Sequence, residues 1–392
     1  MQSIPTTPKT GFIKLPAAII LSKEGVDFFT KAGKPTKRVV GREGTPQEGL
    51  KAEGFVAPTL QKLIMNSYVD EVYLAEPALL PLRSEIISTN NLIVYAILYR
   101  KLSPTLATKI IDTPVFKEFN RKNPKYAVWD LQALALDKAQ KLLEHKRDTL
   151  ERIQNEMELA IKERLQAMDL EEEDKQSRIR ATSKFIRWAD ARVWYLYLIV
   201  FNTSLRNEIE RAFVEIFLQY LENTQIATHL SNLLMEFVQN AEKAHFERII
   251  FRHNYAPREE IDRFLRNRTN RQLVIDTARK DKQFLEISWL LKANKSSYGK
   301  TYRLGVVVSN YGLISETTRS RLAAKLKTNT EGIALADFYK ESSDQDRLGA
   351  GLGLLYNSYL EDLCRKKGIK YFCNIFPEPK TERTTVFVEI QF

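Results

Sequence analysis

The sequence predicts an α+β protein in which long helices and short strands occupy different parts of the chain. Residues 131–174 contain no glycine or proline and favour helix throughout. The last third instead contains short runs rich in β-branched and aromatic residues, at 285–291, 302–308, 370–376 and 385–392. We expect these runs to form a mixed sheet that helices cover on one face, which makes this part a two-layer α/β sandwich.

Three regions are expected along the chain. Residues 1–127 are expected to form a small α/β module. Its position ahead of the other two regions suggests an input or docking domain. Residues 128–223 predict a helical, dimerisation-like region, and residues 224–392 contain the sandwich. In the first region the patterns predict a strand at 12–21, a loop at 31–49, a helix at 60–68, a strand at 71–74 and helices at 91–102 and 104–112.

Composition bounds the function only broadly. The chain has 392 residues and a formal net charge of +11, which permits an anionic partner but does not select one, and nucleic acid is not indicated. The two cysteines, Cys364 and Cys373, are too few for a disulfide framework or a structural zinc site. We interpret both as small hydrophobic side chains in a reducing compartment.

A cytoplasmic protein with no membrane span is expected. The partly apolar stretch at 11–21 is interrupted by Lys14 and Pro16, and no small-residue cleavage pattern follows it. The most apolar run, residues 193–201, has about half the length that a helix needs to cross a bilayer.

The helical region favours a coiled coil. Within residues 131–174 apolar residues recur at heptad spacing, and the other faces of the helix are charged. The residues at these positions are Leu136, Ala139, Leu143, Leu150, Ile153, Met157 and Ala160. Together with helices expected at 177–201 and 204–222, this pattern predicts a homodimer through helices 131–222. The alternative is a long amphipathic helix that packs against its own chain.

A glycine-rich turn before a helix predicts a phosphate-binding site. Gly349, Gly351 and Gly353 stand at alternate positions, and an apolar helical pattern begins directly after them at Leu354. Backbone N–H groups in such a turn lack partners, and the helix dipole adds partial positive charge.

The helix expected at 228–244 predicts a second part of the same site. Its apolar residues follow the i, i+3, i+4, i+7 pattern and are Leu230, Leu233, Leu234, Phe237, Val238 and Ala241. Glu236, Asn240 and Lys243 then lie in a row on the flank of the buried face. A carboxylate, an amide oxygen and an ammonium group suit a magnesium-bound triphosphate, because Mg²⁺ prefers oxygen ligands and phosphates attract a cation.

In order and spacing, five segments of residues 224–392 resemble the GHKL, or Bergerat-fold, ATPase superfamily, and within it the sensor histidine kinases. The segments are Glu236–Lys243 for the N box, Val306–Ser315 for the first glycine box, Phe338–Lys340 for the lid motif, Gly349–Leu354 for the second glycine box and Thr384–Phe387 for the closing strand. The resemblance implies a histidine kinase-like ATPase domain with ATP and Mg²⁺ as cofactors.

The resemblance also implies roles for single residues. Glu236 would act as a base or orient the metal, and Asn240 would hold Mg²⁺ beside it. Asn310 and Thr385 would contact adenine, and Lys243 would contact phosphate. The other nucleotide contacts implied by the boxes are Gly312, Lys340, Gly349, Gly351, Leu352 and Gly353.

Two positions depart from the family pattern. Asn310 stands where the family has the aspartate that reads adenine, and an amide accepts a hydrogen bond without charge assistance. Ile314 stands where the first glycine box has its second glycine, and a β-branched residue predicts a stiffer hinge for the lid.

The phosphoacceptor expected of a histidine kinase is the weakest match. His145 lies on the long helix, away from the apolar residues, and is the candidate. The family has an acid directly after this histidine and a proline shortly after, and both are absent here.

Three functions therefore stay open. The first is transfer of the γ-phosphoryl group of Mg-ATP to a protein side chain in signal transduction, with a response regulator or another signalling protein as partner. The second is a gyrase-like ATPase that drives a conformational cycle. The third is a degenerate, non-catalytic nucleotide-binding regulator.

Overall fold

The computed structural model describes residues 11–201, 206–296, 299–314 and 352–392. Contacts divide the chain into two compact units. Unit 1 combines the N-terminal part up to Val94 with Ile226–Phe392, and unit 2 is Tyr95–Gln225. Helices and a sheet together make the chain α+β, as the sequence predicted, but the sheet is antiparallel throughout and not mixed as expected.

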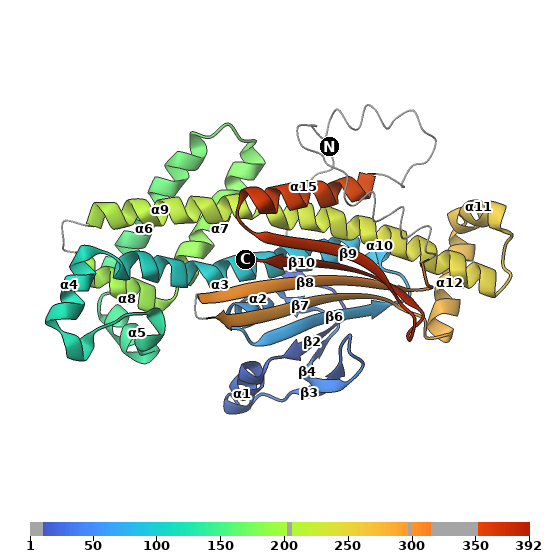
Figure 1. The fold of residues 1–392 in the computed structure, drawn as a ribbon, viewed down its shortest axis with the longest axis horizontal. Helices are drawn as coiled ribbons and strands as arrows, with labels where there is room; N and C mark the ends of the chain where they lie inside the picture. The colour runs from blue at the N-terminus through green and yellow to red at the C-terminus, as the bar shows by residue number, and fades with distance from the viewer. Residues whose placement is uncertain (1–10, 202–205, 297–298, 315–351) are drawn as a thin grey trace. The chain divides into compact units, whose positions relative to one another are not determined.

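Unit 1 is built on one eight-stranded sheet with the order β3-β4-β2-β6-β7-β8-β10-β9, in which every neighbouring pair is antiparallel (Figure 1). Its strands are β2 (Ala17–Leu21), β3 (Lys37–Val40), β4 (Pro46–Ala52), β6 (Val69–Glu76), β7 (Leu285–Ser296), β8 (Gly299–Tyr311), β9 (Lys370–Glu378) and β10 (Arg383–Gln391). A separate ribbon pairs β1 (Phe12–Ile13) with β5 (Phe55–Val56).

The helices of unit 1 come from both ends of the sequence. They are α1 (Lys23–Lys31), α2 (Ala57–Met65), the first part of α3 (Arg83–Ile111), α10 (Gln225–Arg252), α11 (Ile261–Arg266), α12 (Arg268–Lys280) and α15 (Leu352–Lys366), with the 3-10 turns η1 (Leu80–Leu82) and η4 (Arg258–Glu260).

Alternation along the strands separates two faces of the sheet. The indole of Trp289 in β7 donates to Asn90 of α3 at 3.1 Å, and the Asn90 amide donates to Ser231 of α10 at 2.9 Å. Tyr371 of β9 donates to Asn357 of α15 at 2.6 Å. Because directly paired residues point the same way, the strand register assigns further residues to this helix-covered face. They are Ile287, Val306, Val308, Val386 and Val388.

The sheet corrects the expected division of the chain. Strands from residues 17–76 and from residues 285–391 pair in one sheet through β6 and β7, so no boundary at residue 127 separates an N-terminal module from a C-terminal domain. The loop expected at 31–49 instead contains β3 and the start of β4. Local composition could not predict the shared sheet or the strands within 31–49, because both depend on pairing between segments that are distant in the sequence.

Two expected helices are one. The helices expected at 91–102 and 104–112 form the single helix α3, with Pro104 inside it. Leu102 and Leu106 on either side of the proline are buried. Burial of this face outweighs the hydrogen bond that proline removes.

Unit 2 is helical, as expected. Besides the rest of α3 it contains α4 (Pro114–Lys122), α5 (Leu136–His145), α6 (Arg147–Gln166), α7 (Glu172–Trp188), α8 (Ala191–Val200) and α9 (Arg206–Asn223), with the 3-10 turns η2 (Pro124–Tyr126) and η3 (Leu131–Ala133). Its core is aromatic, and Tyr197 and Phe213 have ring centroids 5.5 Å apart. No described helix is long and apolar enough to span a membrane.

The continuous helix expected over 131–174 was wrong. The chain leaves helical geometry at Lys146, between α5 and α6. Leu143, Ile153 and Met157 of the heptad pattern are buried within this one chain, where α5 packs against α8 and α6 against α7 and α9. Helices of the same chain thus cover these three positions, as in the alternative arrangement, whereas Leu136 is 45% exposed. The expected homodimer through helices 131–222 stays a prediction.

Candidate functional site

The candidate site begins where the end of β8 lies beside the start of β10. Asn310 of β8 lies directly opposite Thr384 of β10, and both belong to the helix-covered face. The residues before and after them in the register, Ser309 and Thr385, point to the opposite face. All four side chains are almost fully buried. Asn310 donates its amide N–H to the carbonyl of Tyr311 at 2.9 Å, and no described residue donates to its Oδ1.

Thr384 fixes the chain as it leaves β8. Its hydroxyl donates to the carbonyl of Gly312 at 2.5 Å and accepts from the N–H of Ile314 at 2.9 Å. The turn is held from a second side, because the N–H of Gly312 donates to the carbonyl of Glu382 at 2.8 Å. One hydroxyl therefore fixes the backbone from Gly312 to Ile314.

Gly312 is needed for this turn. Its φ is +111°, which side chains rarely allow, and a Cβ would lie 3.0 Å from the Arg248 guanidinium of α10. The glycine thus combines a backbone turn with the close approach of α10. Ile314 stands where the first glycine box of the GHKL superfamily has its second glycine. It follows this turn and does not form part of it.

The helix α10 has the apolar face that the sequence predicted. Leu230, Leu233, Leu234, Phe237, Val238 and Ala241 are all buried. Asn240 and Lys243 are exposed on the flank, and Lys243 forms a 3.8 Å ion pair with Asp262. Glu236 is half-buried, and this burial raises its pKa while the positive charge of Arg83 opposes the shift.

Helix α10 would supply two oxygen ligands to a magnesium ion. Glu236 and Asn240 offer one carboxylate and one amide oxygen, and Mg²⁺ in nucleotide sites commonly uses one or two carboxylates together with phosphate oxygens and water. Within the described ranges, no group of three or more His, Cys, Asp or Glu side chains is placed to hold a metal ion. Glu236 and Asn240 would therefore hold a magnesium ion only together with the oxygens of a bound nucleotide.

Several predicted contacts lie outside the described residues. Lys340, Gly349 and Gly351 are in the segment 315–351, so their part of the site is not described. Leu352 and Gly353 open α15, the helix that was predicted to follow the glycine turn.

Thr385 faces away from Asn310. Its hydroxyl lies 2.9 Å from that of Ser309 and donates to the carboxylate of Glu378 at 2.9 Å, and Glu378 also accepts from Arg42 at 2.5 Å. Thr384 is the threonine on the side of Asn310. The sequence reasoning missed it because both threonines precede Val386, and only the strand register distinguishes their faces.

His145 ends α5 in unit 2 and is exposed. Its Nδ1 lies 2.7 Å from the carbonyl of Lys141. Since a carbonyl only accepts, Nδ1 carries the proton and Nε2 is the nitrogen left with a lone pair. This nitrogen would be the nucleophile if the residue accepts a phosphoryl group.

Two further polar residues of α10, Glu242 and His245, are buried, and the sequence pattern assigned neither of them a role in the site. Glu242 is buried and accepts from the N–H groups of Leu79 and Leu80 at 2.7 and 2.9 Å, and from Arg271 at 2.7 Å. His245 is fully buried, and neither ring nitrogen has a described hydrogen-bond partner. Both lie on the buried side of the helical pattern, at 238, 241, 242 and 245, which is the one signal that could have marked them.

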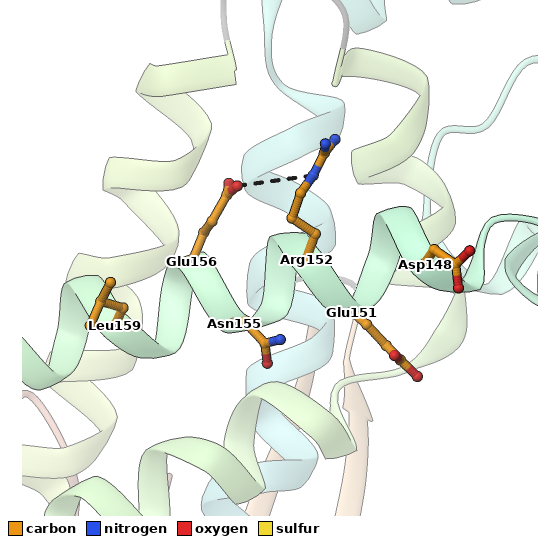
Figure 2. A pocket seen from close by; sticks show the side chains of 6 residues that line it. All are labelled: Asp148, Glu151, Arg152, Asn155, Glu156 and Leu159. Atoms are coloured by element: carbon orange, nitrogen blue, oxygen red, sulfur yellow. Dashed lines mark ion pairs between the residues drawn. The ribbon is translucent and has the colours of Figure 1, made fainter.

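A hollow on α6 of unit 2 does not form a second site. It encloses about 460 Å³, and Figure 2 shows the six side chains around it spreading from one exposed side of the helix. They are Asp148, Glu151, Arg152, Asn155, Glu156 and Leu159. The ion pair between Arg152 and Glu156, at 4.0 Å, is an ordinary i,i+4 surface pair.

Residues 8–392 match DUF8084, described as a family of unknown function. The chain belongs to DUF8084. This DUF8084 member is also similar to a protein of Treponema pallidum (strain Nichols) named "Uncharacterized protein", with 22% identity over 386 residues that cover 98% of this chain and 99% of the relative. No solved structure matches this chain.

Proposed function

We propose that this DUF8084 protein binds Mg-ATP where β8 ends and β10 begins, and that it transfers the γ-phosphoryl group to a protein side chain, as a histidine kinase-like signalling protein. The observation that carries the proposal is the pairing of Asn310 with Thr384 on the helix-covered face, at the point where the chain leaves β8. The Asn310 amide and the Thr384 hydroxyl are both almost fully buried, and a neighbouring amide and hydroxyl can recognise the edge of a purine through hydrogen bonds.

The order of the surrounding elements supports the same proposal. The chain runs through α10, β7, β8, the segment 315–351, α15, β9 and β10, and the strands assemble as β7-β8-β10-β9. This is the order of N box, first glycine box, lid, second glycine box and closing strand in the resemblance to the GHKL superfamily. Arg248 of α10 lies against Gly312, so α10 reaches the turn after β8.

Nucleotide binding is tested first, by thermal shift with ATP, ADP and GTP, each with and without Mg²⁺. Binding to the native state stabilises it by about 2.7 kcal/mol at a hundredfold excess over the dissociation constant. We expect a magnesium-dependent rise in Tm with ATP that Thr384→Val reduces. No shift with any of the three nucleotides would remove the proposal.

Phosphoryl transfer is tested separately with γ-labelled ATP. Label on the protein that is lost in His145→Gln would identify the acceptor as His145. Label on an added response regulator but not on the protein itself would place the acceptor on a partner. Binding without any transfer would leave a non-catalytic nucleotide-binding regulator.

A second candidate, ATP hydrolysis that drives a conformational cycle, is favoured by Glu236. A half-buried carboxyl with a raised pKa is a stronger base than an ordinary carboxyl and is suited to accept a proton from an attacking water. Steady ATP turnover that Glu236→Gln abolishes, while ATP still raises Tm, would favour this function over phosphoryl transfer.

A further inference from the structure

Strand β9 forms one end of the eight-stranded sheet. One of its sides pairs with β10 along the whole length from Lys370 to Glu378, and within the described ranges no strand pairs with its other side, which forms the edge of the sheet. The alternate residues Lys370, Phe372, Asn374, Phe376 and Glu378 share the face away from α15. Phe372 is 52% exposed there, next to exposed Lys370 and Asn374.

The backbone groups of the edge can be assigned from one contact. The N–H of Ile375 donates to the side-chain Oδ1 of Asn374 at 2.9 Å, so it points away from β10. Because these directions alternate along an antiparallel strand, the N–H groups of Tyr371 and Cys373 point outward too. Pro377 shares this parity, and its missing N–H therefore costs no hydrogen bond to β10.

The strand is complementary to itself when reversed. With Asn374 opposite its own counterpart in a second copy, Phe372 comes opposite Phe376, and Lys370 comes opposite Glu378. Opposite charges and paired aromatic side chains at directly facing positions each stabilise a sheet by roughly 0.2–1 kcal/mol. In a two-fold arrangement every such pair occurs twice.

We propose that the edge of β9 is a self-association surface, on which β9 of a second copy pairs antiparallel about a two-fold axis at Asn374. Tyr371, Cys373 and Ile375 of each copy then donate their outward N–H groups across the axis. The Asn374 side chain releases the N–H of Ile375 and turns toward its counterpart. Glu378 keeps its bonds to Arg42 and Thr385 and accepts the Lys370 charge at its remaining exposed side, which is 27% accessible.

This occupant is favoured over an unrelated peptide because the match of charge and shape lies within β9 itself. The surface is distinct from the heptad residues of unit 2, such as Ile153 and Met157, which are already buried in their own chain. It does not depend on nucleotide binding, so failure of one proposal leaves the other intact.

The first test measures the dimer dissociation constant of the full chain by sedimentation. We expect a dimer whose dissociation constant rises roughly tenfold or more with Phe372→Glu or Lys370→Glu, because each change acts twice across the axis. Matched controls are Phe251→Glu, at a phenylalanine that is 44% exposed on α10, and Lys380→Glu, in the exposed turn between β9 and β10. A chain that is monomeric throughout, or a dimer that none of the four changes affects, would overturn the proposal.

The second test fixes the register by a disulfide in a Cys373→Ala background. Asn374 and its counterpart form a non-hydrogen-bonded pair, with Cα atoms about 4.5 Å apart, which suits a disulfide. Asn374→Cys should therefore give a covalent dimer that a thiol reductant reverses. Phe372→Cys is the control, because its two copies would lie four positions out of register, roughly 14 Å apart. Equal cross-linking of both variants, or none of Asn374→Cys, would exclude this pairing.

Discussion

Glu242 and Lys243 are adjacent on α10, yet their surroundings are opposite. Glu242 is 1% exposed and accepts three hydrogen bonds that join α10 to η1 and α12. Lys243 is exposed and has one long ion pair at the surface. Both lie in the segment that resembles the N box. One short motif thus contains both residues that stabilise the fold and residues that are accessible to a ligand. Only the face of the helix on which they lie separates them.

The place where β8 ends and β10 begins shows the same contrast. Thr384 holds the turn after β8 on the helix-covered face, whereas Thr385 is closed into a network with Ser309 and Glu378 on the other. Substitutions at neighbouring positions should therefore separate loss of stability from loss of ligand binding.

The largest effect is expected for Glu242→Ala. The change leaves Arg271 and two backbone N–H groups without their acceptor in a buried place, and breaking a buried pair in this way costs about 3–5 kcal/mol. Urea unfolding measures the loss. Lys243→Ala, one residue away, should change the free energy of unfolding by less than about 1 kcal/mol. Equal effects of the two changes would contradict the contrast.

His245 should make stability depend on pH. Burial lowers its pKa from 6.5 to about 4; the nearby backbone of Gln283 opposes this shift, and the charges of Arg248 and Arg383 add to it. The unfolded chain therefore binds a proton more readily, so stability present above pH 6.5 is lost as pH falls, by roughly 3 kcal/mol at pH 4.

The check compares unfolding free energies between pH 7 and 4 for the natural chain and His245→Leu, which should lack this part of the slope. His253→Asn is the control, because His253 is exposed beside Asp281. If all three chains lose stability in parallel, His245 does not remain neutral in the fold.

Thr384→Val and Thr385→Val should have different consequences. The first removes the hydroxyl beside Asn310 and should weaken Mg-ATP binding about tenfold, or about 1.4 kcal/mol. The second removes the hydroxyl that Ser309 and Glu378 share, although Glu378 keeps its bond from Arg42, and should cost about 1–3 kcal/mol of stability, with little change in affinity. Calorimetric titration and urea unfolding of both variants give the two readouts. If Thr385→Val weakens binding and Thr384→Val does not, the nucleotide binds on the face of the sheet that carries Thr385.

The smallest effect is expected for Glu236→Gln. Because burial raises the pKa of Glu236, the folded state holds the proton more tightly than the unfolded chain does. The ionised group thus disfavours folding above its raised pKa. The amide should make the protein slightly more stable at neutral pH, and this gain should shrink as pH falls through the raised pKa. Melting curves over that range test it; a constant difference at every pH would show that ionisation is not the cause.

Local patterns predicted much of unit 1. The periodicity of residues 228–244 identified the buried residues of α10, because a helix with one covered face repeats every 3.6 residues. The strand-like runs that begin at Leu285 and Lys370 appear as β7 and β9 for a similar reason, since each strand is rich in residues that suit a pleated, half-buried surface.

The missed features depend on distant parts of the chain. The contrast between Thr384 and Thr385 follows from the register with β8, which the composition of β10 does not contain. The break at Lys146 turns α6 onto α7 and α9, and the heptad spacing alone is equally compatible with a partner from another chain.

The pairing of β6 with β7 also has a consequence for biosynthesis. Leu74 pairs with Ile287, more than two hundred residues later, so the ribosome releases β2, β4 and β6 long before their neighbour exists. Unit 2 emerges in between and has the local helical contacts that form quickly. A nascent chain that stops before residue 285 therefore exposes the edge of β6, and we expect chaperones to bind it there until translation reaches β7.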